Sequence, residues 1–169
     1  MILIVKIILG FGVLFGLYVL GAILYAHLTD YKQEPEEQTE VLEKKKKLPT
    51  LDKDTLVFYN WNIGYAGLGK ESDFFYDGGK MVRPTEALSD KNLSGIFNKL
   101  QTWSSDADFI EIQEIDRNSK RSYYKDQFKM AFSTLKNYKG VFGKNYDVKF
   151  VVMPFLEPLG KIVGGIATF

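Results

Sequence analysis

The sequence predicts an α/β domain that follows a single membrane-spanning helix. Two observations predict this fold class: an uncharged apolar run at residues 7–26 and, after it, β-rich runs that alternate with a stretch of helical spacing. Strands that alternate with helices are typical of β-α-β units, in which the strands pair in parallel. We expect an anchor over 1–28, a charged linker over 29–50 and a folded domain over 51–169.

Composition excludes some classes of function and supports a buried core. The 169-residue chain has no cysteine, which excludes disulfides and thiolate chemistry. Its formal net charge of +1 gives no support for a strongly nucleic-acid-binding protein, because such proteins usually carry a basic excess. The 13 Phe and 10 Tyr supply enough large side chains for a core.

The apolar run at residues 7–26 is long enough to cross the roughly 30 Å hydrocarbon core of a bilayer as a helix. A cleaved signal peptide is the alternative, but its apolar region is typically about 7–15 residues and ends in a small-x-small site. This run is longer and no such site follows, so we expect an uncleaved anchor. Lys6 precedes it, which favours an extracytoplasmic domain, although the lysines at 44–47 weaken that orientation.

Residues 29–50 are polar and charged and cannot bury much apolar surface, so we expect a solvated tether. Its lysine run could contact anionic lipid headgroups, and a plain solubilising spacer is the alternative. After the tether, residues 55–63 are continuously apolar enough for a buried strand. A glycine-punctuated loop leads from there to a helix, which Ser89 or Asp90 would cap, and then to a second strand at 107–115.

The last third of the chain predicts one more helix and three short strands. Helical spacing of apolar residues covers 121–136, and β-rich runs follow, beginning at Tyr138, Asp147 and Lys161. The final run reaches Phe169 with no polar tail, so we expect an apolar edge with unpaired backbone groups. From this we predict that the chain is a truncated piece of a larger domain.

Two strands carry polar side chains where their apolar rows end. Because side chains alternate along a strand, Ile110, Ile112 and Glu114 would share one face, and so would Phe58 and Asn62. If the strands are parallel neighbours, Asn62 and Glu114 meet at the edge where open α/β sheets place ligand sites. Hard oxygen ligands of this kind suit Mg²⁺ or Mn²⁺. In the alternative, Glu114 lies past the strand end and reaches water.

The stretches "FYNWNIG" (58–64) and "DFIEIQEID" (108–116) together resemble the endonuclease/exonuclease/phosphatase superfamily, the deoxyribonuclease-I-like phosphoesterases. The run "GYAGLGKESDFFYDGGKMVRP" (64–84) is similar to its membrane-anchored bacterial members. The resemblance implies that Glu114 is a direct ligand of the catalytic Mg²⁺ and that Asn62 helps to bind the metal or the scissile phosphate. It also implies the N-terminal half of a four-layer α/β/β/α sandwich.

The sequence departs from the family pattern in its later strands. From Tyr138 onward it contains neither the family's Asp-x-Asn motif nor its terminal Asp-His pair, and the only histidine, His27, ends the membrane segment. We therefore expect the fragment to be inactive by itself. Two weaker candidates for substrate contact are Arg121, on the loop after Glu114, and Asn145, which precedes an expected strand.

The expected function is a membrane-anchored, Mg²⁺- or Mn²⁺-dependent phosphoesterase that uses metal-activated water. Its substrate would be a nucleic acid, a phospholipid headgroup or an inositol phosphate, because the motifs are common to all three classes. The alternative is a membrane-anchored binding or scaffold protein that keeps the fold without the chemistry.

Overall fold

The computed structural model describes residues 2–44 and 52–169 of the chain. Its helices and strands are α1 (Ile2–Leu28), β1 (Glu40–Leu42), β2 (Phe58–Asn62), α2 (Glu86–Trp103), β3 (Phe109–Asp116), α3 (Gln127–Thr134), β4 (Gly140–Val151) and β5 (Gly160–Thr168). Three 3₁₀ turns lie at η1 (Gly64–Ala66), η2 (Phe75–Asp77) and η3 (Lys120–Ser122). The lysines at 45–47 and the expected domain start at residue 51 lie outside the described residues.

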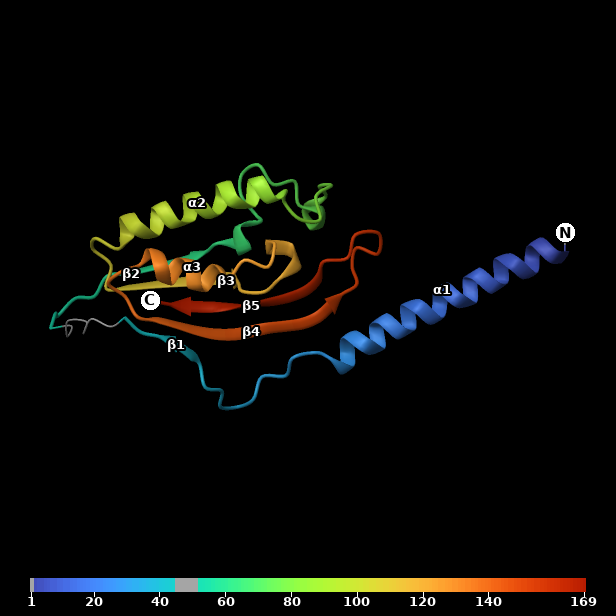
Figure 1. The fold of residues 1–169 in the computed structure, drawn as a ribbon, viewed down its shortest axis with the longest axis horizontal. Helices are drawn as coiled ribbons and strands as arrows, with labels where there is room; N and C mark the ends of the chain where they lie inside the picture. The colour runs from blue at the N-terminus through green and yellow to red at the C-terminus, as the bar shows by residue number, and fades with distance from the viewer. Residues whose placement is uncertain (1, 45–51) are drawn as a thin grey trace.

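α1 is a single straight helix that projects away from the sheet (Figure 1). It has 27 residues, and none of its side chains is buried against the rest of the protein. At 1.5 Å per residue it is about 40 Å long, which exceeds the roughly 30 Å of bilayer hydrocarbon. Within the described residues, the structure therefore shows one helix that is long and apolar enough to span a membrane, and the expected run at 7–26 lies inside it.

The strands form one mixed sheet in the order β1-β4-β5-β3-β2. β2 and β3 are parallel neighbours, as the sequence predicts, and the other pairs are antiparallel. Both α2 and α3 lie on the same side of this sheet (Figure 1). The core between them and the sheet contains Leu93 and Leu100 of α2, Phe128 of α3, and Ile110 and Ile112 of β3.

β2 differs from the buried strand that the sequence predicts. It ends the sheet order, and among the described strands only β3 pairs with it. Tyr59 and Trp61 turn toward α2. The Tyr59 ring stacks on the Trp103 ring, and the Trp61 ring meets the Trp103 ring edge-on. Phe58 and Asn62 are exposed on the opposite face of the sheet, which the helices leave uncovered. The apolar character of this stretch therefore reflects one buried face and not two.

β3 contains a β-bulge that sequence alternation does not predict. The pairing with β5 shifts between Ile112 and Ile115, so that Gln113 and Glu114 together oppose one residue of β5. Ile115, and not Glu114, continues the buried row, and Glu114 is exposed. The expectation that Glu114 shares a face with Ile110 and Ile112 is therefore wrong, because the extra residue turns its side chain to the open side.

Both helices of the domain begin at residues other than those expected. α2 begins after Thr85, whose hydroxyl accepts a hydrogen bond from the Leu88 N–H at 3.3 Å, and not after Ser89 or Asp90. α3 begins only at Gln127, after Tyr124, which has a φ of +58° that no α-helix can contain. The expected helix over 121–136 is therefore shortened to a two-turn segment.

In place of the three short C-terminal strands that the sequence predicts, the structure has two long ones, β4 and β5, which pair as an antiparallel hairpin. β5 lies between β4 and β3 in the sheet. At its end, Phe169 exchanges both backbone hydrogen bonds with Ile110 at 2.9 and 3.0 Å, and its side chain is buried. The expected unpaired edge at the end of the chain is therefore wrong.

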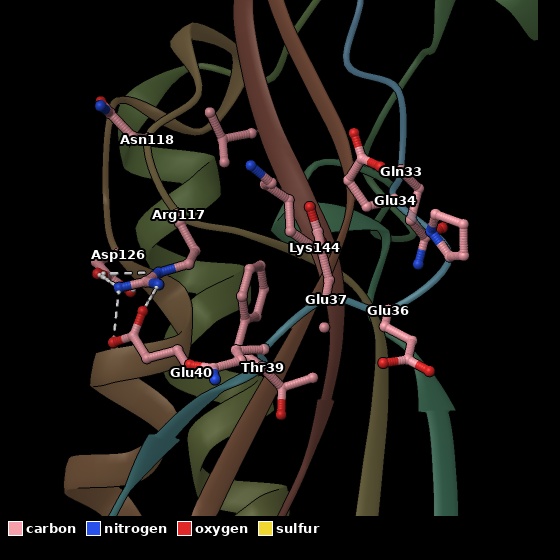
Figure 2. Close-up of a pocket in the computed structure, with 15 residues that line it drawn as sticks. Gln33, Glu34, Glu36, Glu37, Thr39, Glu40, Arg117, Asn118, Asp126 and Lys144 are labelled. Carbon is pink, nitrogen blue, oxygen red and sulfur yellow. Dashed lines mark hydrogen bonds and ion pairs between the residues drawn. The ribbon is translucent and has the colours of Figure 1, made fainter.

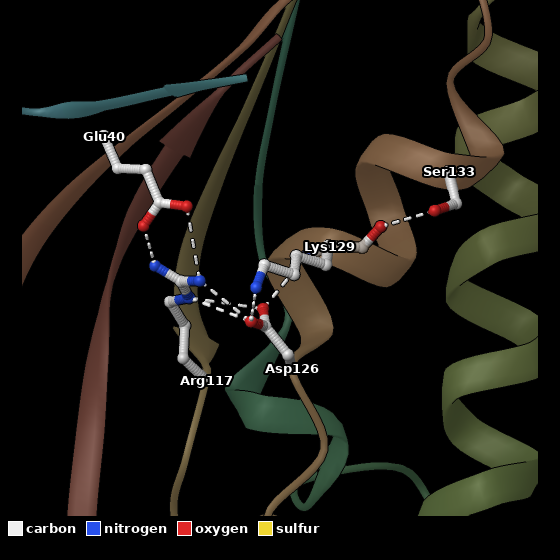
Figure 3. Close-up of polar contacts among 5 residues, drawn as sticks. All are labelled: Glu40, Arg117, Asp126, Lys129 and Ser133. Carbon is white, nitrogen blue, oxygen red and sulfur yellow. Dashed lines mark hydrogen bonds and ion pairs between the residues drawn. The ribbon is translucent and has the colours of Figure 1, made fainter. Parts of the chain in front are cut away.

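The expected tether is partly built into the sheet. Residues 40–42 form β1, which pairs antiparallel with β4. Arg117, which directly follows β3, bonds the Glu40 carboxylate on one side and the Asp126 carboxylate on the other, the latter at 2.8 Å (Figure 3). The charged composition of this segment thus reflects an ion pair with the domain and not only solvation, and the prediction of a free tether is wrong at residues 40–42.

Candidate functional site

Asn62 and Glu114 come together at the C-terminal ends of β2 and β3. The Asn62 Nδ2 donates a hydrogen bond to the Glu114 Oε1 at 2.8 Å, and both side chains are exposed on the uncovered face of the sheet. The parallel register that pairs Asn62 with Gln113 brings the two side chains to the same level. The structure therefore places the two residues predicted for the site side by side.

The bulge in β3 gives Glu114 its position. Glu114 has a φ of +52°, a backbone conformation that a residue with a Cβ rarely adopts. Such conformations cost about 1–3 kcal/mol each and persist only where the surrounding structure fixes them. Bulges are also frequent beside active sites, where they redirect a side chain. Here the bulge aims one carboxylate at the end of the neighbouring strand.

The Asn62 amide is oriented by two partners. Its Oδ1 accepts a hydrogen bond from the Gly64 N–H at 2.9 Å, and its Nδ2 faces Glu114. The amide oxygen is therefore turned away from the carboxylate, in contrast to the expectation that both oxygens face one cation. Asn62 fixes the direction of the Glu114 carboxylate, whose Oε2 accepts no hydrogen bond within the described part of the chain.

A second row of polar side chains extends the site along the uncovered face. Asn60 donates to the Glu111 carboxylate at 3.0 Å, and its Oδ1 accepts from Gln113 at 3.1 Å. None of these three residues is among the four predicted for the site. Side-chain alternation along the strand indicates the position of Asn60, because residues two apart in a strand, such as Asn60 and Asn62, share a face.

The donor set fits a weakly held hydrated cation. Among residues 2–44 and 52–169, no group of three or more His, Asp or Glu side chains could hold a metal ion. Mg²⁺, however, usually keeps several waters and binds proteins through one or two carboxylates together with substrate phosphates. Glu114, with one free carboxylate oxygen on the open face, meets that lower requirement, and Asn62 meets it only as an orienting group.

Arg121 is bound to a buried acid and not free for substrate. Its Nε and Nη2 donate to the two oxygens of Asp116, each at 2.9 Å, and its guanidinium stacks on the Tyr65 ring at 3.7 Å. Burial alone would lower the pKa of Arg121, but the hydrogen bonds and charge of Asp116 outweigh it, so the pKa is raised. A substrate phosphate could reach this guanidinium only through the N–H groups of Nη1 and Nη2 that do not bond Asp116.

Asn145 lies inside β4 and does not precede a strand as expected. It occupies an irregularity in the pairing of β4 with β5, between Lys144 and Tyr146. Because β5 separates β4 from β3, Asn145 is two strands away from Glu114. The structure does not bring it together with Asn62 and Glu114.

Two hollows lie near these elements. A groove of about 520 Å³ runs between α2 and the segment that follows β2; Asn62 is among its lining residues, with Trp61, Leu68, Asn92 and Ile96. A larger, open pocket of about 940 Å³ is lined by residues 33–40 and, among others, by Arg117 and Lys144 (Figure 2). The larger pocket includes none of the four residues predicted for the site.

Comparisons of this chain with protein-family models, with curated proteins and with solved structures find no match. The resemblance to the deoxyribonuclease-I-like superfamily therefore stays a prediction from the two strand motifs.

Proposed function

We propose that this protein is a membrane-anchored component of a Mg²⁺- or Mn²⁺-dependent phosphoesterase, with Glu114 as the metal ligand. The observation that carries the proposal is the contact of Asn62 with Glu114 at the C-terminal ends of two parallel strands, at a bulge that gives Glu114 a positive φ. The strand motifs that resemble the deoxyribonuclease-I-like superfamily point to the same two residues and give Glu114 the same role. In the proposed four-layer sandwich, a second sheet would pack against the uncovered sheet face and leave open the edge at the C-terminal ends of β2 and β3, where Asn62 and Glu114 lie.

Each residue has a defined part in this proposal. The Oε2 of Glu114 holds the cation, and the Asn62 amide keeps the carboxylate pointed outward through its 2.8 Å hydrogen bond. A bound Mg²⁺ would act as a Lewis acid on a phosphoryl oxygen and lower the pKa of a bound water. Asn60 and Gln113 bond to each other farther back on the same face, so in this proposal they join β2 to β3 and do not contact the phosphoester.

The substrate is proposed only as a class, a phosphoester. The formal net charge of +1 does not favour non-specific binding to duplex nucleic acid, which depends on neutralising phosphates. α1 would hold the domain close to phospholipid headgroups, which favours a lipid or another substrate at the membrane surface. His27 is the only histidine and belongs to α1, so we propose that these 169 residues bind the metal and do not hydrolyse substrate unaided.

Metal binding by the full chain in lipid nanodiscs tests the proposal. A titration with Mn²⁺, followed by electron paramagnetic resonance of the free ion, should show one bound ion. Glu114→Gln should abolish this binding and leave the circular dichroism spectrum unchanged, because the glutamine still accepts the hydrogen bond from Asn62. The matched control is Glu43→Gln, at the opposite edge of the sheet, where Glu43 pairs with Lys139.

Equal Mn²⁺ affinity of the wild type and Glu114→Gln would remove Glu114 from the metal site. No binding by the wild type would instead favour the alternative, an anchored binding or scaffold protein. One observation favours that alternative: among the described residues Asn62 meets a single carboxylate, that of Glu114, and already satisfies one of its oxygens without a cation.

A further inference from the structure

Gln127 is a fully buried amide at the start of α3. Its exposed fraction is 0%, although glutamine is mostly an exposed residue. A buried amide is stable only when its donor and acceptor both have partners. Gln127 meets this requirement with two backbone groups from different elements: one belongs to the last residue of β3, and the other to the 3₁₀ turn η1 that follows β2.

The two partners of Gln127 lie close to the two residues of the proposed site. Its Oε1 accepts a hydrogen bond from the Asp116 N–H at 3.0 Å, two residues after Glu114. Its Nε2 donates to the Tyr65 carbonyl at 2.7 Å, three residues after Asn62. One side chain therefore bridges the segments that carry Asn62 and Glu114.

These segments need such a bridge because regular strand pairing ends there. The last backbone hydrogen bond between them joins the Ile63 N–H to the Gln113 carbonyl at 3.1 Å. Beyond it, Tyr65 and Glu114 both have positive φ angles, +44° and +52°, which the surroundings must maintain. The stacking of Arg121 on Tyr65 and its ion pair with Asp116 join the same segments from the side.

We propose that Gln127 is a positioning residue that fixes the Asn62 amide against the Glu114 carboxylate. The proposal rests on the proposed function, because positioning matters only if these two groups form a site. Gln127 is placed to do this because its amide offers one donor and one acceptor, as a backbone peptide group does. It acts through the backbone at Tyr65 and Asp116 and does not contact the site itself.

Gln127→Glu tests this role through its dependence on pH. The ionised carboxylate of this variant has the same shape as the amide but only accepts hydrogen bonds, so it would face the Tyr65 carbonyl without a donor. The protonated carboxyl group regains one O–H donor and keeps one acceptor, and burial raises the pKa of a carboxyl group toward neutral pH. The variant should therefore be misaligned at pH 7.5 and regain the native arrangement at pH 5.5.

The first readout needs no metal. In the full chain in nanodiscs, the ¹H–¹⁵N resonances of the Asn62 side-chain amide should move in Gln127→Glu at pH 7.5 and return to the wild-type positions at pH 5.5. The matched control is Gln101→Glu, at an exposed position of α2, which should leave the Asn62 resonances unchanged at both pH values. A residue that only stabilises the fold would give no reversible recovery of this one group.

The second readout is Mn²⁺ affinity at pH 7.5, which should fall about 10- to 100-fold in Gln127→Glu, the loss typical of residues that orient a metal ligand. If the wild type binds no Mn²⁺, the proposed function fails, and the Asn62 resonances still test the positioning. If Gln127→Glu does not fold at pH 7.5, Gln127→Asn replaces it, since it is one methylene shorter and should displace Asn62 at every pH. Unchanged Asn62 resonances in a folded Gln127 variant would overturn the proposal.

Discussion

Replacing Asp116 by asparagine should destabilise the domain by about 2–3 kcal/mol. Asp116 is completely buried and binds Arg121 through two hydrogen bonds of 2.9 Å. Removing one partner of a buried ion pair costs about 3–5 kcal/mol, because the other charge loses its compensation. The Arg121 side chain is 19% exposed, so water recovers part of that loss, and the asparagine oxygen can keep one of the two hydrogen bonds, worth about 1 kcal/mol.

Urea unfolding of the nanodisc-bound chain, followed by the fluorescence of Trp61 and Trp103, measures this effect. With a slope of about 2 kcal/mol per M urea, the midpoint should fall by about 1–1.5 M. The double variant Asp116→Asn with Arg121→Met should recover at least half of the loss, since it leaves no unpaired charge. Asp54→Asn, at an exposed position, is the control. If Asp116→Asn lowered the free energy of unfolding by less than about 0.5 kcal/mol, the reasoning that the Asp116–Arg121 ion pair stabilises the domain would be refuted.

Two further predictions concern the attachment of β1 and the burial of Tyr65. Arg117→Met removes the cation that joins β1 to the start of α3, and β1 should then detach more easily by about 1 kcal/mol, a discounted value because its Glu40 partner is 41% exposed. Hydrogen exchange at Val41 should become about fivefold faster, and an unchanged rate would show that strand pairing alone holds β1. Burial raises the pKa of Tyr65 to about 12, so the folded state keeps this proton after the unfolded state has lost it. The contribution of Tyr65 to the free energy of unfolding should therefore be constant below about pH 10 and fall as the pH rises from 10 toward 12. In urea unfolding, the midpoint of Tyr65→Phe should fall less over this pH range than that of the wild type. An identical fall in both proteins would exclude Tyr65 as its source.

The sequence is sufficient to predict that Asn62 and Glu114 lie close together, but it does not predict the β-bulge that brings their side chains to the same face. The apolar stretches around Trp61 and Ile112, with a helical stretch between them, are sufficient to predict parallel strands whose C-terminal ends meet. The alternation rule then assigns Glu114 to the buried face, because it assumes two residues per repeat throughout. The bulge adds one residue to β3, and Ile115 takes the buried position that the rule gives to Glu114.

The other differences also arise from contacts between distant parts of the chain. Glu40 reads as a solvated charge in a charged segment, and its partner Arg117 is far away in the sequence. Arg121 reads as a free cation until the structure shows it against Asp116. Gln127 gives no sequence signal at all, because its importance depends on two backbone groups that only the folded chain brings to it.

Because β1 is part of the sheet, the linker between the membrane helix and the folded domain is shorter than the sequence predicts. Residues 29–39 alone separate the end of α1 from β1. At about 3.3–3.6 Å per extended residue, that segment reaches at most about 40 Å, roughly half of what a free segment over 29–50 would allow. With α1 inserted as proposed, the Asn62–Glu114 edge stays within the reach of this segment and of the domain itself, so molecules attached to the membrane would meet it more often than molecules dissolved in the bulk.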